Sequence, residues 1–199
     1  MIEHMRRLIP FLLAAIAAHA QSISVGAIAG APLTDVVSNA TSVSSLQAVA
    51  KSTNVTGGGS LQVSLPKKLR IEVDVLFRPY SFSLASLGAS SAVSAHQFRF
   101  PVLLQYRLGS GLIRPYVEGG LSFNHLTGIS SAFISTVKSG PGQLLHQSDA
   151  GVVLGAGVEA KIPALFRVSG EVRYTRDTVA AFSNISNLNQ AEVLVGVHF

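Results

Sequence analysis

The sequence has no cysteine and no tryptophan, and charged residues make up only 13% of its 199 positions. The lack of cysteine excludes disulfide bonds and thiolate metal centres. Hydrophobic residues make up 48% of the chain and the mean hydropathy is +0.42, both higher than a soluble domain usually needs. The length suits one domain with a sizeable core. The composition therefore favours a single domain that contacts a membrane.

Long hydrophobic runs are also missing from most of the chain. A membrane-spanning helix needs about 20 consecutive apolar residues. Beyond the N-terminal segment, an arginine, a glutamate or a polar cluster interrupts every candidate. Only helices and closed β-barrels satisfy their backbone hydrogen bonds in lipid. If this chain crosses a membrane, we expect it to cross with β-strands.

The N-terminal segment has the order of a cleavable signal peptide. Arg6 and Arg7 precede an apolar run at residues 8–18, followed by the small-residue pattern Ala-His-Ala. Such a run is too short to cross about 30 Å of hydrocarbon as an anchoring helix. We therefore predict a signal peptide at residues 1–20 and one domain at residues 21–199.

The mature protein is accordingly expected to begin at Gln21, directly after the small-residue pattern. N-terminal sequencing of the membrane-inserted protein checks this expectation. Recovery of Met1 on folded, inserted protein would contradict it.

The charges do not indicate a nucleic-acid partner. The predicted signal peptide takes two arginines and one glutamate from totals of 15 basic and 10 acidic residues, which leaves 13 against 9. These charges lie singly along the chain rather than in a basic stripe. We therefore expect no nucleic-acid binding.

Charged and apolar residues alternate most clearly at residues 69–78, LRIEVDVLFR. Four apolar side chains fall on one face of the extended segment and charged ones dominate the other, which is the period of a β-strand. The same period recurs at residues 98–107 and 166–174. Weaker segments compatible with strands lie at residues 22–30, 59–66, 112–124, 150–161 and 190–199.

The polar faces of these eight segments hold fourteen of the 22 charges of the predicted mature chain, and the apolar faces hold none. The fourteen are Arg70, Glu72, Asp74, Arg78, Arg99, Arg107, Arg114, Glu118, Glu159, Lys161, Arg167, Glu171, Arg173 and Glu192. An arginine or lysine facing the bilayer midplane costs roughly 2 to 4 kcal/mol, so a lipid-facing surface excludes charge in this way. A soluble sheet with one wet face shows the same alternation.

The lengths of the connections favour the membrane interpretation. Short links, at residues 66–68, 108–111 and 162–165, alternate with long ones, at residues 31–58, 79–95, 125–149 and 176–189. Outer-membrane barrels have short periplasmic turns and longer outer loops. We therefore predict an all-β fold, an eight-stranded antiparallel up-and-down transmembrane β-barrel.

The last nine residues, AEVLVGVHF, place three valines and the terminal Phe199 on one face. This pattern resembles the C-terminal signal by which the barrel-assembly machinery recognises outer-membrane barrels. The segments FRFPVLLQYRL and RPYVEGGLSF resemble the central hairpin of the small OmpA-like, opacity-type barrel family. The resemblance implies a bacterial outer-membrane location, both termini on the periplasmic side, and contact with outer-membrane lipid and lipopolysaccharide. It does not extend to the peptidoglycan-binding domain of longer OmpA-type proteins.

Two local features bear on the regularity of the strands. The run Gly57-Gly58-Gly59 lacks the lysine and helix of a phosphate-binding loop, so we interpret it as a flexible approach to a strand. Pro101 and Pro115 lie inside predicted strands and are expected to weaken the register there.

Side chains suited to catalysis or metal binding are few. The histidines of the predicted mature chain are His96, His125, His146 and His198, and they form no cluster with the spacing of metal ligands. We therefore predict no catalytic, cofactor-binding or metal-binding residue, and no cofactor.

Three functions remain open. The leading one is a non-enzymatic outer-membrane barrel that supports the envelope or presents its loops to an unidentified ligand. The second is a soluble secreted lipocalin-like barrel, whose apolar faces would point inward to a ligand and whose charges would point to solvent. The third is a lipid A deacylase, because some outer-membrane barrels use a His-x-Ser pair and a glutamate, here His146, Ser148 and Glu159.

The interior predicted for this barrel is narrow and charged. An eight-stranded barrel is just wide enough for side chains to fill. Charges of both signs can either line a water path or pair across the interior, and the strand count favours pairing. The opposed groups would be Arg70, Arg99, Arg114 and Arg173 against Glu72, Glu118, Glu171 and Glu192.

Overall fold

The computed structural model describes residues 22–34, 46–51, 55–86, 89–128, 148–162, 166–178 and 187–199. The predicted signal peptide and His146 lie outside these residues. The described part of the chain holds no helix with the length and apolar character needed to cross a bilayer.

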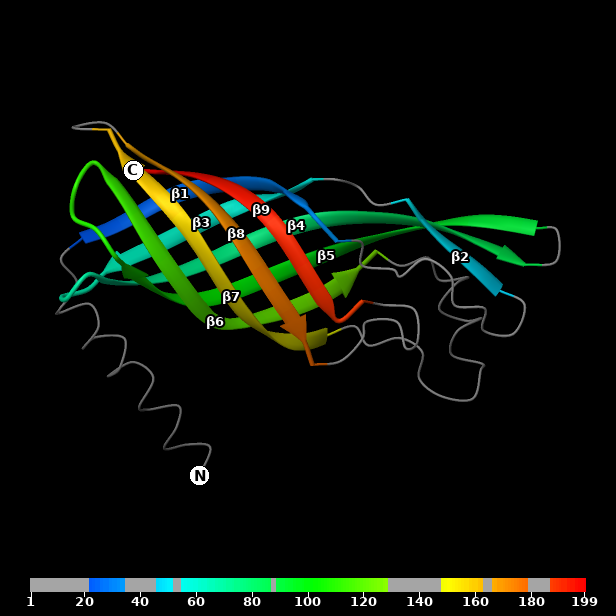
Figure 1. The fold of residues 1–199 in the computed structure, drawn as a ribbon. Helices are drawn as coiled ribbons and strands as arrows, with labels where there is room; N and C mark the ends of the chain where they lie inside the picture. Colours follow the sequence, from blue (N-terminus) through cyan, green and yellow to red (C-terminus); the bar gives the residue numbers. More distant parts are fainter. Residues whose placement is uncertain are drawn as a thin grey trace, which may run out of the picture.

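Nine antiparallel strands form a single sheet, and eight of them close into a barrel (Figure 1). The strands are β1 (Ser22–Pro32), β2 (Leu46–Lys51), β3 (Thr56–Ser64), β4 (Leu69–Ser86), β5 (Ala89–Arg107), β6 (Ile113–Thr127), β7 (Ser148–Lys161), β8 (Arg167–Asp177) and β9 (Asn189–His198). The barrel runs β1-β3-β4-β5-β6-β7-β8-β9, and β9 pairs with β1 to close it. The predicted eight-stranded antiparallel barrel is therefore confirmed.

The two ends of the barrel differ in their connections. Short turns join β3 to β4, β5 to β6 and β7 to β8 at the end where Phe199 also lies, here the turn end (Figure 1). The longer connections follow β1, β6 and β8 at the opposite end, here the loop end. The predicted alternation of short and long links is confirmed at these positions.

Side-chain burial shows which face of the wall points inward. Arg70, Glu72 and Asp74 are at most 1% exposed, whereas Val73 and Val75, which alternate with them, are 37% and 48% exposed. The charged face thus lines the interior and the apolar face covers the outside. The lipocalin-like alternative is wrong, because it requires the opposite arrangement.

The inward assignment holds for ten of the fourteen charges and weakens toward the turn end. Ten are buried, while Arg107, Arg114 and Arg167 are half-buried and Lys161 is exposed. Lys161 has the same place in the alternation as the buried Glu159, and its side chain is exposed because this residue ends β7, where the wall stops.

The predicted loops at residues 31–58 and 79–95 are wrong in part. Strands β4 and β5 continue pairing past Pro79 and His96 to Ser86 and Ala89. The short strand β2, inside the first predicted loop, pairs with this extension of β4. The three strands form a sheet that projects beyond the loop end of the barrel, here the β2–β4–β5 sheet (Figure 1).

Glycine and proline inside the strands do not interrupt the barrel. Gly57, Gly58 and Gly59 belong to β3 rather than to a flexible approach, so that interpretation is wrong. A Cβ atom on Gly58 would lie 1.8 Å from the carbonyl oxygen of Val75, so glycine lets β3 and β4 approach closely. Pairing along β5 and β6 keeps one register through Pro101 and Pro115, contrary to the expected weakening. Among the described strands, the β4–β5 ladder alone has a local gap, opposite Phe100 and Pro101, and Pro101 has no N–H to donate.

The turn between β3 and β4 holds two lysines in the left-handed backbone region. Lys67 and Lys68 have φ angles of 60° and 66°. The turn is closed by hydrogen bonds from Leu69 N to Pro66 O (3.4 Å) and from Leu65 N to Leu69 O (2.9 Å). This geometry suits a two-residue hairpin turn, in which Asn-Gly is the favoured pair.

Replacing this pair, with Lys67→Asn and Lys68→Gly together, should therefore stabilise the barrel. Each left-handed non-glycine residue costs of order 1–3 kcal/mol, so we expect the free energy of unfolding to rise by about 1 kcal/mol or more. Urea unfolding in lipid vesicles measures the change. The double variant Lys67→Ala and Lys68→Ala removes the same charges without relieving the backbone, and should not stabilise the barrel. Equal effects of the two pairs would contradict the backbone explanation.

Candidate functional site

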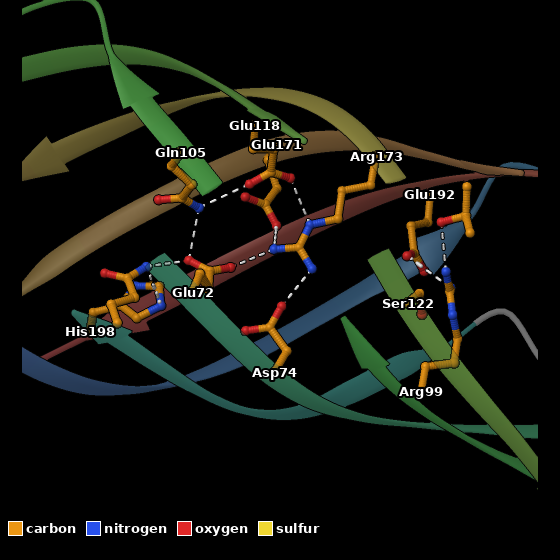
Figure 2. Close-up of polar contacts among 12 residues, drawn as sticks. Glu72, Asp74, Arg99, Gln105, Glu118, Ser122, Glu171, Arg173, Glu192 and His198 are labelled. Carbon is orange, nitrogen blue, oxygen red and sulfur yellow. Dashed lines mark hydrogen bonds and ion pairs between the residues drawn. The ribbon is translucent and has the colours of Figure 1, made fainter. Parts of the chain in front are cut away.

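The centre of the barrel is organised around the side chain of Arg173 on β8 (Figure 2). Its guanidinium group forms ion pairs with four carboxylates, those of Glu72 (2.5 Å), Asp74 (2.6 Å), Glu118 (2.8 Å) and Glu171 (2.7 Å). The carboxylates come from β4, β6 and β8, so this one arginine ties together separate parts of the wall. All five side chains are buried.

Neutral polar side chains extend this central cluster toward the turn end. Gln105 donates hydrogen bonds to Glu72 (2.8 Å) and Glu118 (2.9 Å). Gln62 donates to Glu72 (2.5 Å) and lies 3.0 Å from the ring nitrogen of His198. Figure 2 shows Gln105 and His198 on the same side of Arg173. The amides therefore share Glu72 with Arg173 and connect it to His198.

A second polar layer lies nearer the loop end. Arg99 pairs with Glu192 (2.9 Å) and donates a hydrogen bond to Thr175 (2.7 Å). Asp177 accepts hydrogen bonds from Asn124 (3.0 Å) and Gln190 (2.7 Å). Figure 2 places the Arg99–Glu192 pair apart from the central cluster.

A small apolar cluster interrupts the polar interior. Ile28, Leu76 and Leu194 pack together and are at most 4% exposed. Polar, charged and apolar side chains thus all project into the barrel, as expected for a narrow interior that side chains fill.

Three of the central carboxylates have the spacing of metal ligands. Oxygen atoms of Glu72, Glu118 and Glu171 lie within 4.8 Å of one another. The guanidinium of Arg173 pairs with all three, so the positive charge that a cation would supply is provided by the protein itself. The arrangement therefore suits cross-bracing of the wall better than metal binding.

The proposed deacylase residues are not brought together where the structure describes them. Ser148 begins β7 and Glu159 lies eleven residues further along the same strand. At about 3.3 Å per residue, they are about 36 Å apart along the strand. Glu159 is buried and pairs with Arg70 (2.7 Å), whereas Ser148 is exposed and lies 2.8 Å from the ring nitrogen of His125. The geometry gives no support to this alternative.

Several inward-facing residues were not singled out by the sequence. Tyr116 is buried and donates a hydrogen bond to Glu171, and His198 is buried beside Gln62. Both signals were present, because Tyr116 shares the face of Arg114 and Glu118, and His198 alternates with the outward valines of β9.

The opposed charges do pair across the interior, which bears on conduction. Arg99 pairs with Glu192 and Arg173 with the central carboxylates, as predicted, whereas Arg70 and Arg114 pair with Glu159, which the prediction did not name as their partner. In an eight-stranded barrel this leaves little room for water. We therefore expect planar-bilayer recordings of the folded protein to show small or no conductance. A large steady conductance, comparable to that of a general porin, would contradict this arrangement.

Comparison with known proteins agrees with this geometry. A closed eight-stranded wall with apolar residues outside and paired charges inside defines a small transmembrane β-barrel. Residues 8–199 match the model of the outer membrane protein beta-barrel domain, and the chain belongs to that family. The protein is therefore a bacterial outer-membrane barrel. The comparison with curated proteins gives no match.

Two solved structures show the same fold. Neisserial surface protein A is 16% identical with a TM-score of 0.59, over 90% of this chain and 97% of that chain. The outer membrane protein OprG from Pseudomonas aeruginosa is 12% identical with a TM-score of 0.55, over 91% of this chain and 97% of that chain. Because short turns face the periplasm in outer-membrane barrels, we expect the turn end to lie on the periplasmic side.

Proposed function

We propose that this protein is a non-enzymatic surface protein whose β2–β4–β5 sheet binds a partner outside the cell. The observation that carries the proposal is the continuation of β4 and β5 past the barrel, with β2 added alongside (Figure 1). Longer connections face outward in outer-membrane barrels, so this sheet extends from the cell surface.

The chemistry of the β2–β4–β5 sheet suits recognition. Residues 79–95 contain no Asp, Glu, Lys or Arg. In the part of the chain that the structure describes, β5 pairs with β6 only from His96 onward, so residues 89–95 pair with β4 alone. The other edge of β5 there offers backbone N–H and C=O groups, to which an extended segment of a partner can add.

The interior and exterior of the barrel then have separate roles. The ion pairs around Arg173 brace the wall, and the apolar outer face holds the protein in lipid. Contact with lipopolysaccharide and recognition of the last strand by the barrel-assembly machinery belong to the same proposal. Their support is the apolar outer face and the exposed terminal Phe199.

Shortening the hairpin tests the binding role. Pro79 and His96 are directly paired, so residues 80–95 can be replaced by an Asn-Gly turn without changing the register of the barrel. We expect this variant to fold, as shown by its heat-modifiable migration on a gel. Cells expressing it should adhere less to a panel of immobilised extracellular proteins than cells expressing the unshortened protein.

The control separates binding from envelope support. The shortened protein should still restore detergent resistance to a strain that lacks the full-length protein, because its barrel is intact. Unchanged adhesion with the shortened protein, or no adhesion from the full-length protein, would contradict the binding role.

A further inference from the structure

At the turn end of the interior, three arginines pair with a single carboxylate, and a fourth adds its charge to theirs. Glu159 forms ion pairs with Arg70 (2.7 Å), Arg167 (3.3 Å) and Arg114 (3.7 Å). The charge of Arg107 interacts with those of Arg70, Arg114 and Glu159. We call these four side chains the arginine ring.

The arginine ring has more positive charge than its surroundings neutralise. Three guanidinium groups pair with one carboxylate, the charge of Arg107 adds to theirs, and the next contact inward from Arg70 is the neutral amide of Gln105 (3.3 Å). Among the described residues, no second acidic side chain pairs with the arginine ring. Charges of one sign this close together repel one another unless an anion lies between them.

Several donors of the arginine ring are buried without a partner. Nε of Arg70, Nε of Arg107 and Nη2 of Arg167 have no hydrogen-bond acceptor in the structure. A buried donor left unpaired is costly, and arginine is the side chain best suited to hold an oxyanion with several N–H groups. Because the Arg70 side chain is only 1% exposed, this set of donors is built into the barrel wall rather than lying on its surface.

The arginine ring is partly exposed at the turn end. The side chains of Arg114 and Arg167 are 18% and 14% exposed, so the ring passes from a buried floor at Arg70 to an accessible rim. Lys67, Lys68 and Lys161 lie exposed around the same end. An anion can therefore approach from the turn end along a surface of increasing positive charge.

We propose that the arginine ring is a binding site for a phosphate group that enters from the periplasmic end of the barrel. A phosphate carries the negative charge that the ring lacks, and its oxygens can accept hydrogen bonds from several guanidinium groups at once. Inorganic phosphate and the headgroup of an anionic phospholipid share this chemistry. Binding would neutralise the ring and satisfy its buried donors.

Titration of the folded, full-length protein with inorganic phosphate tests the site. In nanodiscs of phosphatidylcholine, calorimetry should show one saturable site that weakens as sodium chloride is raised. Arg167→Gln and Arg107→Gln, each made as a single variant, should weaken binding about tenfold or more. This is the loss expected for one charge-assisted hydrogen bond. Arg176→Gln removes the same charge from the other end of β8 and should change affinity by less than about twofold.

A second arm distinguishes the source of the phosphate group. Nanodiscs containing phosphatidylglycerol, without free phosphate, are examined by native mass spectrometry for lipid retained on the protein. Retention that Arg167→Gln abolishes and Arg176→Gln preserves would support the site with a lipid headgroup as its ligand. Saturable binding of inorganic phosphate with the same dependence would support it with a soluble ligand.

The proposal is wrong if the protein neither binds inorganic phosphate nor selectively retains phosphatidylglycerol. It is also wrong if Arg167→Gln and Arg176→Gln change ligand binding equally. If Arg167→Gln does not migrate as a folded barrel, Arg114→Gln, which alters a more exposed member of the ring, provides the same comparison.

Discussion

Replacing Arg173 with methionine should destabilise the barrel strongly. The change leaves Glu72, Asp74, Glu118 and Glu171 buried around an apolar side chain, with no guanidinium to pair with them. Removing one partner of a buried ion pair typically costs about 3 to 5 kcal/mol. We therefore expect Arg173→Met to lower the free energy of unfolding by about that amount, or to prevent folding. Urea unfolding in lipid vesicles measures the loss.

Two further variants show whether unpaired carboxylates cause this effect. Arg176→Met removes an exposed arginine from the same strand and should have little effect. Adding Glu72→Gln and Glu118→Gln to Arg173→Met should restore part of the stability, or restore folding, because fewer buried charges then lack a partner. If Arg173→Met is as stable as the unaltered protein, the central cluster does not brace the barrel.

The barrel could be predicted from the sequence because its outer and inner faces differ so strongly. In β4, charges and apolar residues alternate without exception from Leu69 to Asp74, and burial follows that order. Lipid outside and ion pairs inside impose opposite demands on successive residues, and this contrast is visible in one strand alone.

The extension of β4 and β5 beyond the barrel could not be predicted from the alternation of charged and apolar residues. Residues 79–95 carry no charge, and although Tyr80, Phe82 and Leu84 alternate with small residues, neither face has the charges that mark the inner face of the barrel strands. Strand β2 forms by pairing with Leu84 and its neighbours in β4, a contact more than thirty residues away along the chain. Period alone gives no sign of such a partner.

The ion-pair partners of Arg173 also could not be predicted from the sequence. Alternation places Arg173 and Glu72 on inward faces, but their contact depends on the positions of the two residues along the barrel axis. Those axial positions follow from the tilt and stagger of the strands in the closed barrel. Inward faces could therefore be predicted, while the particular ion pairs required the structure.

Replacing Val73 with arginine should damage assembly through the outer face of the same strand. Val73 is 37% exposed on the apolar outside of the barrel, between the inward-facing Glu72 and Asp74. An arginine near the bilayer midplane costs roughly 2 to 4 kcal/mol, so we expect Val73→Arg to reduce the folded, membrane-inserted fraction strongly. The fraction is measured by heat-modifiable migration on a gel after refolding into lipid vesicles.

Glu72→Gln provides the matched control on the neighbouring residue, because it changes charge inside the barrel and not in lipid. Glu72 is one of four carboxylates that share Arg173, so losing its charge leaves three to pair with that guanidinium. Gln105 and Gln62, which both donate to Glu72, are amides that can reverse their donor and acceptor ends to suit a glutamine. We therefore expect Glu72→Gln to fold nearly as well as the unaltered protein. Equal loss of folding in Val73→Arg and Glu72→Gln would contradict the assignment of Val73 to the lipid-facing side of β4 and of Glu72 to the interior.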